Sequence, residues 1–277
     1  MVNQPRVLII ILNYGTYDLT INLIIEIKKT IEYQSYSIMV VDNCSPNESE
    51  RVLSEKSHEL NFIFYANKTN AGYAAGNNIG IRYGIENGYD YSWVLNNDVE
   101  LREKNILRHM IEIAENDESI GCIGPRILSN EGAICAPYCR RPSLWSMTGG
   151  IGIEKRYRQK FKDKAREVYR VYGCCMLLKN SAMAEIDCMD ERTFLYGEED
   201  ILAERLLAAG YISYYDAKVS VIHKGSSSVK KMSRNSKQLQ IRETEKSLDI
   251  YLKDYRHFPW VARWVCKSVR RLIIKVR

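Results

Sequence analysis

The sequence lacks long apolar runs and paired cysteines. No stretch approaches the ~20 apolar residues that a membrane-spanning helix needs. The polar start Met1–Pro5 and the short apolar run Val7–Leu12 also differ from a signal peptide. The eight cysteines include no Cys-x-x-Cys pair and no Cys/His spacing typical of zinc sites. We therefore expect a protein without a spanning helix or zinc site, with free thiols in a reducing cytosol.

Two common phosphate-binding motifs are missing as well. The chain has no G-x-x-x-x-G-K loop, and its glycine-containing segment "NAGYAAGNNIG" (70–80) is not the dinucleotide fingerprint. The small residues of this segment let a backbone approach a ligand closely. A tight loop packed under a helix is the alternative interpretation.

Positive charge is concentrated at the carboxyl end of the chain. The net charge is +6 over 277 residues, a length that suits one large domain or a domain with a tail. Between Tyr255 and Arg277 there are seven basic residues and no acidic one. The basicity is therefore a local feature of the tail.

The first hundred residues alternate between strand and helix patterns. Continuous apolar or β-branched runs predict four strands, and helical spacing predicts a helix after each of the first three. The expected strands are Val7–Leu12, Ser37–Val41, Asn61–Tyr65 and Tyr91–Leu95. This order predicts an α/β fold with a mainly parallel, twisted sheet and helices on both faces.

Polar residues follow three of these strands directly. They are Asn13-Tyr14, Asp42-Asn43 and Asn96-Asn97-Asp98. Ligands of such sheets bind beyond the carboxyl ends of the strands, so we expect these groups to line one crevice. Asp98 is also suited to hold a hard divalent cation, which prefers oxygen ligands. Turn caps without any ligand are the alternative for each set.

A second group of candidates lies in the later part of the chain. Glu198, Glu199 and Asp200 stand in a row where a helix is predicted to begin. Acids are favoured there by the helix dipole, but crowded carboxylates also raise a pKa and can create a general base. His223 precedes a Lys-Gly-Ser-Ser-Ser run that could close over a phosphate, or it is a structural histidine.

The remaining segments are less regular. Residues 138–168 show no clean period and are expected to form a long, partly mobile excursion, and Lys224–Arg234 is expected to be flexible. Helices are predicted near Ser236–Asp254 and Trp260–Val276. In the last helix one face is apolar and the other is basic: Val261, Trp264, Val265, Val269, Leu272, Ile273 and Val276 against Arg263, Lys267, Arg270, Arg271, Lys275 and Arg277.

This amphipathic pattern fits a helix on an anionic membrane surface, formed by residues 258–277. A helix docked on the domain with a solvated basic face is the alternative. Nucleic-acid binding is not expected, since no recognised module accompanies the charge.

Seven segments in order carry a resemblance to a known family. They are "ILNYG", "VVDNCSPNES", "NAGYAAGNNIGI", "WVLNNDVEL", "YGCCMLLKN", "FLYGEED" and "VIHKGSSS". Together they resemble glycosyltransferase family 2, the inverting nucleotide-sugar enzymes of the GT-A fold, across roughly residues 5–230. The similarity is greatest to rhamnosyltransferase-like and galactofuranosyltransferase-like members.

The resemblance implies roles for the candidate residues. The metal ion, Mg²⁺ or Mn²⁺, would be held by Asp98 with His223. The base would be Glu199, followed by Asp200 and then Glu198. The nucleotide sugar would contact the strand ends and the glycine-containing segment, through Asn13, Tyr14, Asp42, Asn43, Gly72, Asn77, Asn78, Asn96 and Asn97.

Two features depart from the common family pattern. The metal motif is Asn-Asn-Asp rather than Asp-x-Asp, which leaves one carboxylate and makes metal binding depend on the nucleotide. The acidic run is Glu-Glu-Asp-Ile rather than acid, acid, apolar, acid, which leaves the register of the base open by one residue.

The resemblance also implies an organisation and an activity. Residues 1–235 would form the GT-A domain, with a nucleotide-binding half (1–100) and an acceptor half (101–235), and 236–277 a helical extension. The protein would move a sugar from a UDP- or dTDP-linked donor to a hydroxyl of a glycan or lipid-linked glycan during cell-surface polysaccharide synthesis. Rhamnose is one candidate for this sugar. The expected location is cytoplasmic, peripheral on the inner face of the cell membrane. The alternative is a non-catalytic nucleotide-sugar-binding homologue in an assembly complex.

Overall fold

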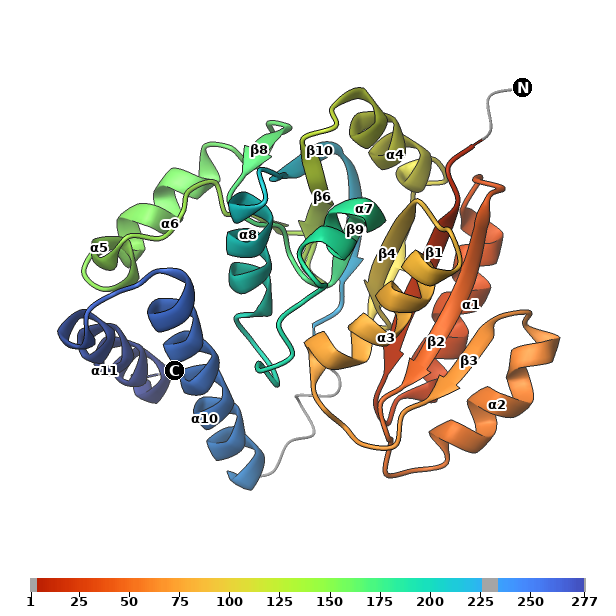
Figure 1. Cartoon of the computed structure of the whole chain (residues 1–277), viewed down its shortest axis with the longest axis horizontal. Coiled ribbons are helices and arrows are strands. Elements are labelled where there is room, and N and C mark those ends of the chain that lie inside the picture. Colours follow the sequence, from red (N-terminus) through yellow and green to blue (C-terminus); the bar gives the residue numbers. More distant parts are fainter. Residues whose placement is uncertain (1–3, 226–233, 277) are drawn as a thin grey trace.

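One β-sheet runs through the centre of the molecule (Figure 1). The computed structural model describes residues 4–225 and 234–276, and in these ranges ten strands join one sheet. Eight of them follow the order β3-β2-β1-β4-β9-β6-β10-β5, with β7 added beside β6 and β8 beside β10. The strands are β1 (Val7–Asn13), β2 (Tyr36–Asp42), β3 (Ile63–Ala66), β4 (Tyr91–Asn96), β5 (Val99–Leu101), β6 (Ile120–Leu128), β7 (Ile134–Cys135), β8 (Arg166–Val168), β9 (Cys175–Lys179) and β10 (Ile212–His223).

Helices cover both faces of the amino-terminal half of the sheet, as predicted. Strand β1 shows why, because Ile9 and Ile11 enter one hydrophobic cluster while Leu8 and Ile10 enter another. The helices are α1 (Tyr17–Thr30), α2 (Ser49–Glu59) and α4 (Ile106–Asn116) on the first face, and α3 (Tyr73–Glu86), α7 (Asn180–Glu185) and α8 (Glu198–Ala208) on the second. Side chains on both faces of β1 are buried, and this explains why its sequence is a continuous apolar run.

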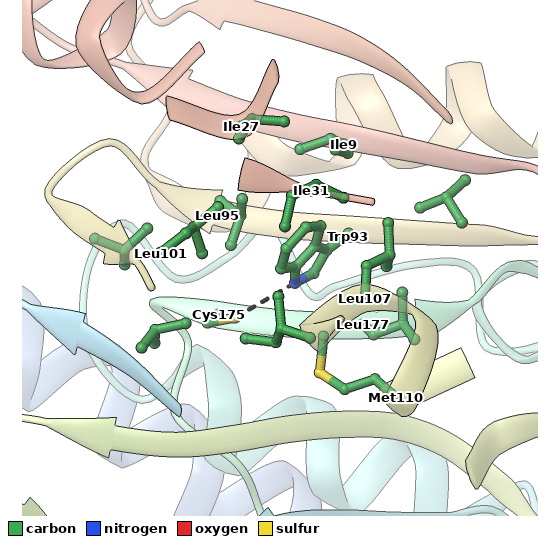
Figure 2. Close-up of a cluster of buried hydrophobic side chains, with 14 of the residues drawn as sticks. Ile9, Ile27, Ile31, Trp93, Leu95, Leu101, Leu107, Met110, Cys175 and Leu177 are labelled. Carbon is green, nitrogen blue, oxygen red and sulfur yellow. Dashed lines mark hydrogen bonds between the residues drawn. The ribbon is translucent and has the colours of Figure 1, made fainter. Parts of the chain in front are cut away.

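Trp93 lies in the middle of the first cluster (Figure 2). Its side chain is fully buried, and its indole N–H donates to the Cys175 sulfur over 3.3 Å. This bond joins neighbouring strands β4 and β9, which pair antiparallel with Leu95 opposite Cys175. The cluster thereby fixes the end of β4, where Asn96 is the last residue and Asn97 and Asp98 follow.

Six of the ten strands, β1–β4, β6 and β10, run in the same direction. Strands β3, β2, β1 and β4 are parallel, and so are β6 and β10. Strand β9 lies between β4 and β6 and is antiparallel to both. The separate strands expected at 211–216 and 219–222 were wrong: β10 is continuous, with a register shift between Asp216 and Ser220.

The expectation of an irregular excursion at 138–168 was also wrong. This stretch forms α5 (Leu144–Met147), α6 (Ile151–Gln159) and β8. A capping box at Ser143 begins α5, and the Arg140 guanidinium lies 3.3 Å from the centre of the Tyr157 ring on α6. Tertiary contacts of this kind hold short helices that have no clear sequence period.

The carboxyl-terminal helices form as predicted. They are α10 (Arg234–Ile250), a π-helical turn η1 (Tyr251–Tyr255) and α11 (Trp260–Val276). Leu248, Tyr251 and Leu252 pack against Ile201 of α8. Most of the segment expected to be flexible, residues 226–233, and also Arg277, lie outside the described residues. No described helix has the length and apolarity to cross a bilayer.

Helix α11 is held through part of its basic face. Arg263 and Lys267 form ion pairs with Asp249 of α10, at 3.4 and 2.9 Å. Arg271 pairs with Glu245 over 2.5 Å. These contacts dock α11 on α10 and set which side of the helix faces solvent.

Candidate active site

The polar groups after three strands form one hydrogen-bond network. Strands β1 and β2 place Asn13 opposite Asp42, and the Asn13 amide donates to Asp42 over 2.6 Å. The Ser45 hydroxyl donates to the same carboxylate, also at 2.6 Å. Thr20 donates to Asn13 and accepts from Asn97, each over 2.9 Å. The ends of β1, β2 and β4 therefore meet at one edge, as the sequence predicted.

Two other predicted residues border this edge. Tyr14 directly follows Asn13 and keeps 46% of its surface exposed. Asn96 is half-buried, and its backbone N–H donates to the Cys174 carbonyl over 2.9 Å. Tyr14 is thus accessible to a ligand, while Asn96 ties β4 to the segment that precedes β9.

Asn43 organises the loop that leads into α3. Its amide group donates to Asn70 over 2.9 Å and to the Gly72 carbonyl over 3.1 Å, and its oxygen accepts from Asn67. Gly72 has φ +97°, and a Cβ there would lie 2.3 Å from the Phe194 carbonyl oxygen. The glycine is therefore required for contact with the loop before the acidic triplet.

We expect Gly72→Ala to destabilise the fold by about 2–4 kcal/mol, since it adds a steric clash to backbone strain. Gly132→Ala is the matched control, because Gly132 has φ +79° with nothing within 4 Å of the added Cβ. It should cost about 1 kcal/mol. Urea unfolding of both variants measures the difference, and equal losses would contradict the Phe194 contact.

Asn77 and Asn78 lie inside the protein. Both are fully buried on α3. The Asn78 amide donates to the Met189 carbonyl over 2.8 Å, and its oxygen accepts from the Met189 N–H over 3.0 Å. Asn77 donates to the Tyr73 carbonyl, and its oxygen has no partner within the described chain. The Asn78 amide therefore joins α3 to the loop leading to Phe194 and supports the site from behind, whereas Asn77 bonds within α3.

Asp98 and His223 come together from distant parts of the chain. Asp98 lies between β4 and β5, and β5 pairs antiparallel with the end of β10, opposing Val99 to His223. The His223 Nε2 lies 3.2 Å from the Asp98 Oδ1. The Lys224 N–H also donates to the Asp98 carbonyl over 3.0 Å. The sheet thus places the two predicted metal ligands side by side.

The Asp98 carboxylate and the His223 imidazole suit a cation that the protein coordinates only in part. Within residues 4–225 and 234–276, no group of three or more His, Cys, Asp or Glu side chains could enclose a metal. One carboxylate and one imidazole leave most coordination positions to other ligands. Mg²⁺ is commonly bound in this way, through one or two carboxylates plus substrate phosphates and water.

The three carboxylates of the acidic triplet have different surroundings. Asp200 pairs with Arg170 over 2.7 Å. Glu199 is half-buried and accepts the Gly173 N–H over 3.2 Å. Glu198 is buried, and its Oε2 has no hydrogen-bond partner in the described chain. Only Glu199 combines partial exposure with a carboxylate that no cation neutralises through a direct pair.

Burial raises the pKa of Glu198 from 4.5 to about 8, and the neighbouring Glu199 carboxylate adds to the rise. Because the folded state then holds the proton more tightly than the unfolded chain, folding stability is lost as pH rises from about 4.5 towards 8.

We therefore expect Glu198→Gln to be more stable than the wild type, by an amount that grows through this pH range to on the order of a few kcal/mol. Urea unfolding at a series of pH values measures the gain. Glu86→Gln, at an exposed position on α3, is the control and should show no such trend. A constant difference at all pH values would contradict the raised pKa.

The segment Gly173-Cys174 lies between the end of β4, which Asp98 follows, and the acidic triplet. Gly173 holds Glu199, and its carbonyl accepts from the Tyr73 hydroxyl over 2.6 Å. The pKa of Cys174 is raised well above its ordinary value, first by burial and Cys175 and then by the Asp98 and Glu199 carboxylates. The Cys174 carbonyl also accepts the Asn96 N–H, so the segment that contacts Glu199 lies against the end of β4.

Sequence reasoning gave no role to Gly173, Tyr73, Arg170, Thr20 or Ser45. The glycine in "YGCCMLLKN" was the one available signal, since a glycine before a strand often marks close approach of another group. A Cβ at Gly173 would lie 2.8 Å from the Glu199 Oε1.

A cavity of about 820 Å³ opens next to the acidic triplet. Helices α5 and α6 line one side and α10 and α11 the other. Its lining includes both charged and aromatic side chains, among them Tyr138, Arg170, Tyr172, Asp200 and Tyr251. A cavity of this size holds a small organic molecule or a sugar-containing ligand.

Comparison with known proteins identifies the family. Residues 7–186 match Glycosyl transferase family 2, and the chain therefore belongs to this family. The low-salt glycan biosynthesis hexosyltransferase Agl10 of Haloferax volcanii is 30% identical over 193 residues, covering 69% of this chain and 58% of that protein. The N-acetylglucosaminyl-diphospho-decaprenol L-rhamnosyltransferase of Mycobacterium tuberculosis is 27% identical over 194 residues, covering 65% and 61%. This chain thus spans about three fifths of these relatives' length.

Solved structures show the same fold. The mannosyltransferase PcManGT of Pyrobaculum calidifontis, in complex with GDP-Man and Mn²⁺, superposes with a TM-score of 0.62 at 13% identity, over 96% of this chain and 69% of that one. GalNAc-T7 with UDP, GalNAc and Mn²⁺ gives 0.64 at 15% identity, over 92% and 50%. The expected GT-A fold is confirmed.

Proposed function

We propose that the protein is an inverting, metal-dependent glycosyltransferase. It transfers a sugar from a UDP- or dTDP-linked donor to a hydroxyl of a glycan or lipid-linked glycan. The observation that supports this most is the Gly173-Cys174 segment: the Gly173 N–H donates to Glu199, and the Cys174 carbonyl accepts from the N–H of Asn96, two residues before Asp98. Family membership and relatives named hexosyltransferase and rhamnosyltransferase support the same activity.

In this proposal the strand-end network binds the donor. Asn13, Asp42 and Asn97 shape the nucleotide pocket, and Tyr14 covers its open side. The buried amides Asn77 and Asn78, with Asn43, Asn96 and Gly72, hold the surrounding loops in place. Residues 1–100 thus form the nucleotide half of the domain, 101–235 the acceptor half, and 236–277 an extension.

Asp98 and His223 would hold Mg²⁺ or Mn²⁺ next to the donor diphosphate. A divalent cation there supplies positive charge for the departing nucleoside diphosphate. Two solved structures of the same fold contain Mn²⁺, which supports this assignment.

Glu199 is the proposed base. It accepts the proton of the acceptor hydroxyl as that oxygen attacks the anomeric carbon from the face opposite the diphosphate. Asp200 is paired with Arg170, and Glu198 is buried with a raised pKa, so both are less suited to the task. The acceptor would enter through the 820 Å³ cavity beside Asp200. A non-catalytic homologue is not favoured, since it would need no such base.

The test is a transfer assay with a panel of nucleotide sugars, including dTDP-rhamnose, and a lipid-linked N-acetylglucosaminyl diphosphate acceptor. The M. tuberculosis relative's name suggests this acceptor. We expect one donor to give a product whose anomeric configuration, measured by NMR, is opposite to that of the donor. Retained configuration would contradict the proposed single displacement.

The proposed membrane contact is made by residues 258–277. Because Arg263, Lys267 and Arg271 are paired with α10, the side of α11 that carries Trp260 and Trp264 is left in solvent. Tryptophan at a membrane–water boundary is energetically favoured.

A further inference from the structure

Exposed apolar side chains gather at one end of the molecule. They lie on α5–α6 and on α11, which Figure 1 shows together at the end farthest from α2 and β3. We name the aromatic face the following set, all at least 39% exposed: Leu144, Trp145, Ile151, Ile153, Trp260, Val261, Trp264 and Leu272. The other exposed large apolar residues of the described chain, Tyr14, Ile25, Tyr65 and Leu207, come from four separate elements or loops.

Three of the four tryptophans belong to this face. Trp145, Trp260 and Trp264 are 56%, 72% and 63% exposed, whereas Trp93 is buried in the core. The Trp145 indole packs closely over Gly150, where a Cβ would lie 2.1 Å from the ring. Exposed tryptophans on two neighbouring elements are more than scattered surface apolar residues require.

The same two segments each carry an excess of positive charge. Residues 140–166 contain nine basic residues and two acidic ones, and residues 255–277 contain seven basic residues and no acidic one. Their combined excess exceeds the net charge of +6, so the rest of the chain is net acidic. Arg263, Lys267 and Arg271 are paired with acids of α10, and exposed apolar and tryptophan side chains on segments that still carry an excess of bases are complementary to an anionic lipid surface.

The proposed acceptor cavity lies between the two segments. Ile151 of α6 is at once part of the aromatic face and part of the cavity lining, and Arg270 of α11 is an exposed residue of the opposite wall. A bilayer against the aromatic face would therefore lie next to the entrance through which a lipid-linked acceptor reaches Asp200.

We propose that α5–α6 and α11 together form one docking face for an anionic bilayer, with Trp145 and Ile153 as a second apolar anchor beside α11. The role of the cavity in this inference rests on the proposed function, but the binding to lipid does not. Two anchors also fix the orientation of the enzyme on the membrane, which one helix alone does not.

Tryptophan fluorescence tests the second anchor directly. In the double variant Trp260→Phe/Trp264→Phe, Trp145 and the buried Trp93 are the remaining tryptophans, and excitation at their absorption edge avoids the tyrosines. With vesicles of phosphatidylcholine and phosphatidylglycerol, we expect its emission to shift to the blue and acrylamide quenching to fall. Phosphatidylcholine vesicles alone should cause little change. A wild-type shift that is absent in this variant would overturn the proposal, since only α11 would then meet the bilayer.

Vesicle flotation gives the matched comparison. We expect Ile153→Ser to lower partitioning into anionic vesicles by about tenfold, and Ile25→Ser, at a similarly exposed site on α1, to leave it unchanged. If Ile153→Ser instead converted a dimer into a monomer in sedimentation without changing vesicle binding, the face would be a contact between two copies and the proposal would be wrong.

Nucleotide-sugar hydrolysis separates lipid docking from the proposed function. The rate of hydrolysis by Ile153→Ser should match that of the wild type. If neither protein hydrolysed any nucleotide sugar, the proposed function would be contradicted but lipid docking would not.

Discussion

Glu199→Gln is expected to lower kcat for sugar transfer by about a thousandfold, within the range that general-base catalysis supplies. The amide oxygen of glutamine can still accept the Gly173 N–H, so the fold and the position of the side chain should persist. The lost property is the ability to take the proton from the acceptor hydroxyl. Because this proton moves only in the transition state, KM for the donor should change little.

The neighbouring carboxylates provide the comparison. Asp200→Asn weakens the pair with Arg170 and should reduce activity less than Glu199→Gln does, through misplacement of the acceptor. Steady-state kinetics on both variants, with the melting temperature as a check of folding, give the ranking. If Asp200→Asn were the inactive variant and Glu199→Gln retained turnover, the base would be assigned one residue too early.

Asp98→Ala is expected to lower kcat/KM by about a hundredfold or more, since a charge that stabilises the leaving group is then poorly held. Asp98 provides the one carboxylate of the proposed metal pair, so the concentration of Mn²⁺ needed for half-maximal activity should also rise. His223→Ala should cause a smaller loss, of about tenfold, because an imidazole contributes no negative charge.

Titration of activity with Mn²⁺ and with Mg²⁺ measures this effect in each variant. Asp98→Asn is the conservative control, since it keeps the size of the side chain and removes the charge. It should behave more like Asp98→Ala than like the wild type. An unchanged metal titration in Asp98→Ala would show that the cation, if needed, is bound elsewhere.

The amino-terminal half of the fold was predictable because its signals are local. The continuous apolar runs at Val7–Leu12 and Tyr91–Leu95 correspond to β1 and β4 within a residue. The placement of β9 between β4 and β6 depends on pairing between distant residues, such as Leu95 with Cys175. Helices α5 and α6 are stabilised by contacts such as Arg140 with Tyr157, which no periodicity reveals.

One part of the candidate site could be predicted from the sequence: the polar residues at the ends of the strands. Asn13, Asp42 and Asn97 meet because parallel strands end at one edge. The sequence could not rank the acidic triplet, because the difference lies in burial and in partners from another segment. Likewise, the helical wheel of residues 260–276 gave two faces, and only the ion pairs of Arg263 and Lys267 with Asp249 show which one is covered.

The most direct test of the account is a thermal-shift measurement that separates donor binding from chemistry. The wild type, Asp98→Ala and Glu199→Gln would each be melted with a nucleotide sugar that is a substrate, with and without Mn²⁺. A ligand that binds only the folded state raises the melting temperature. We predict a metal-dependent rise in the wild type and in Glu199→Gln, and its loss in Asp98→Ala. A metal-dependent rise of wild-type size in Asp98→Ala would contradict a donor site built around this carboxylate.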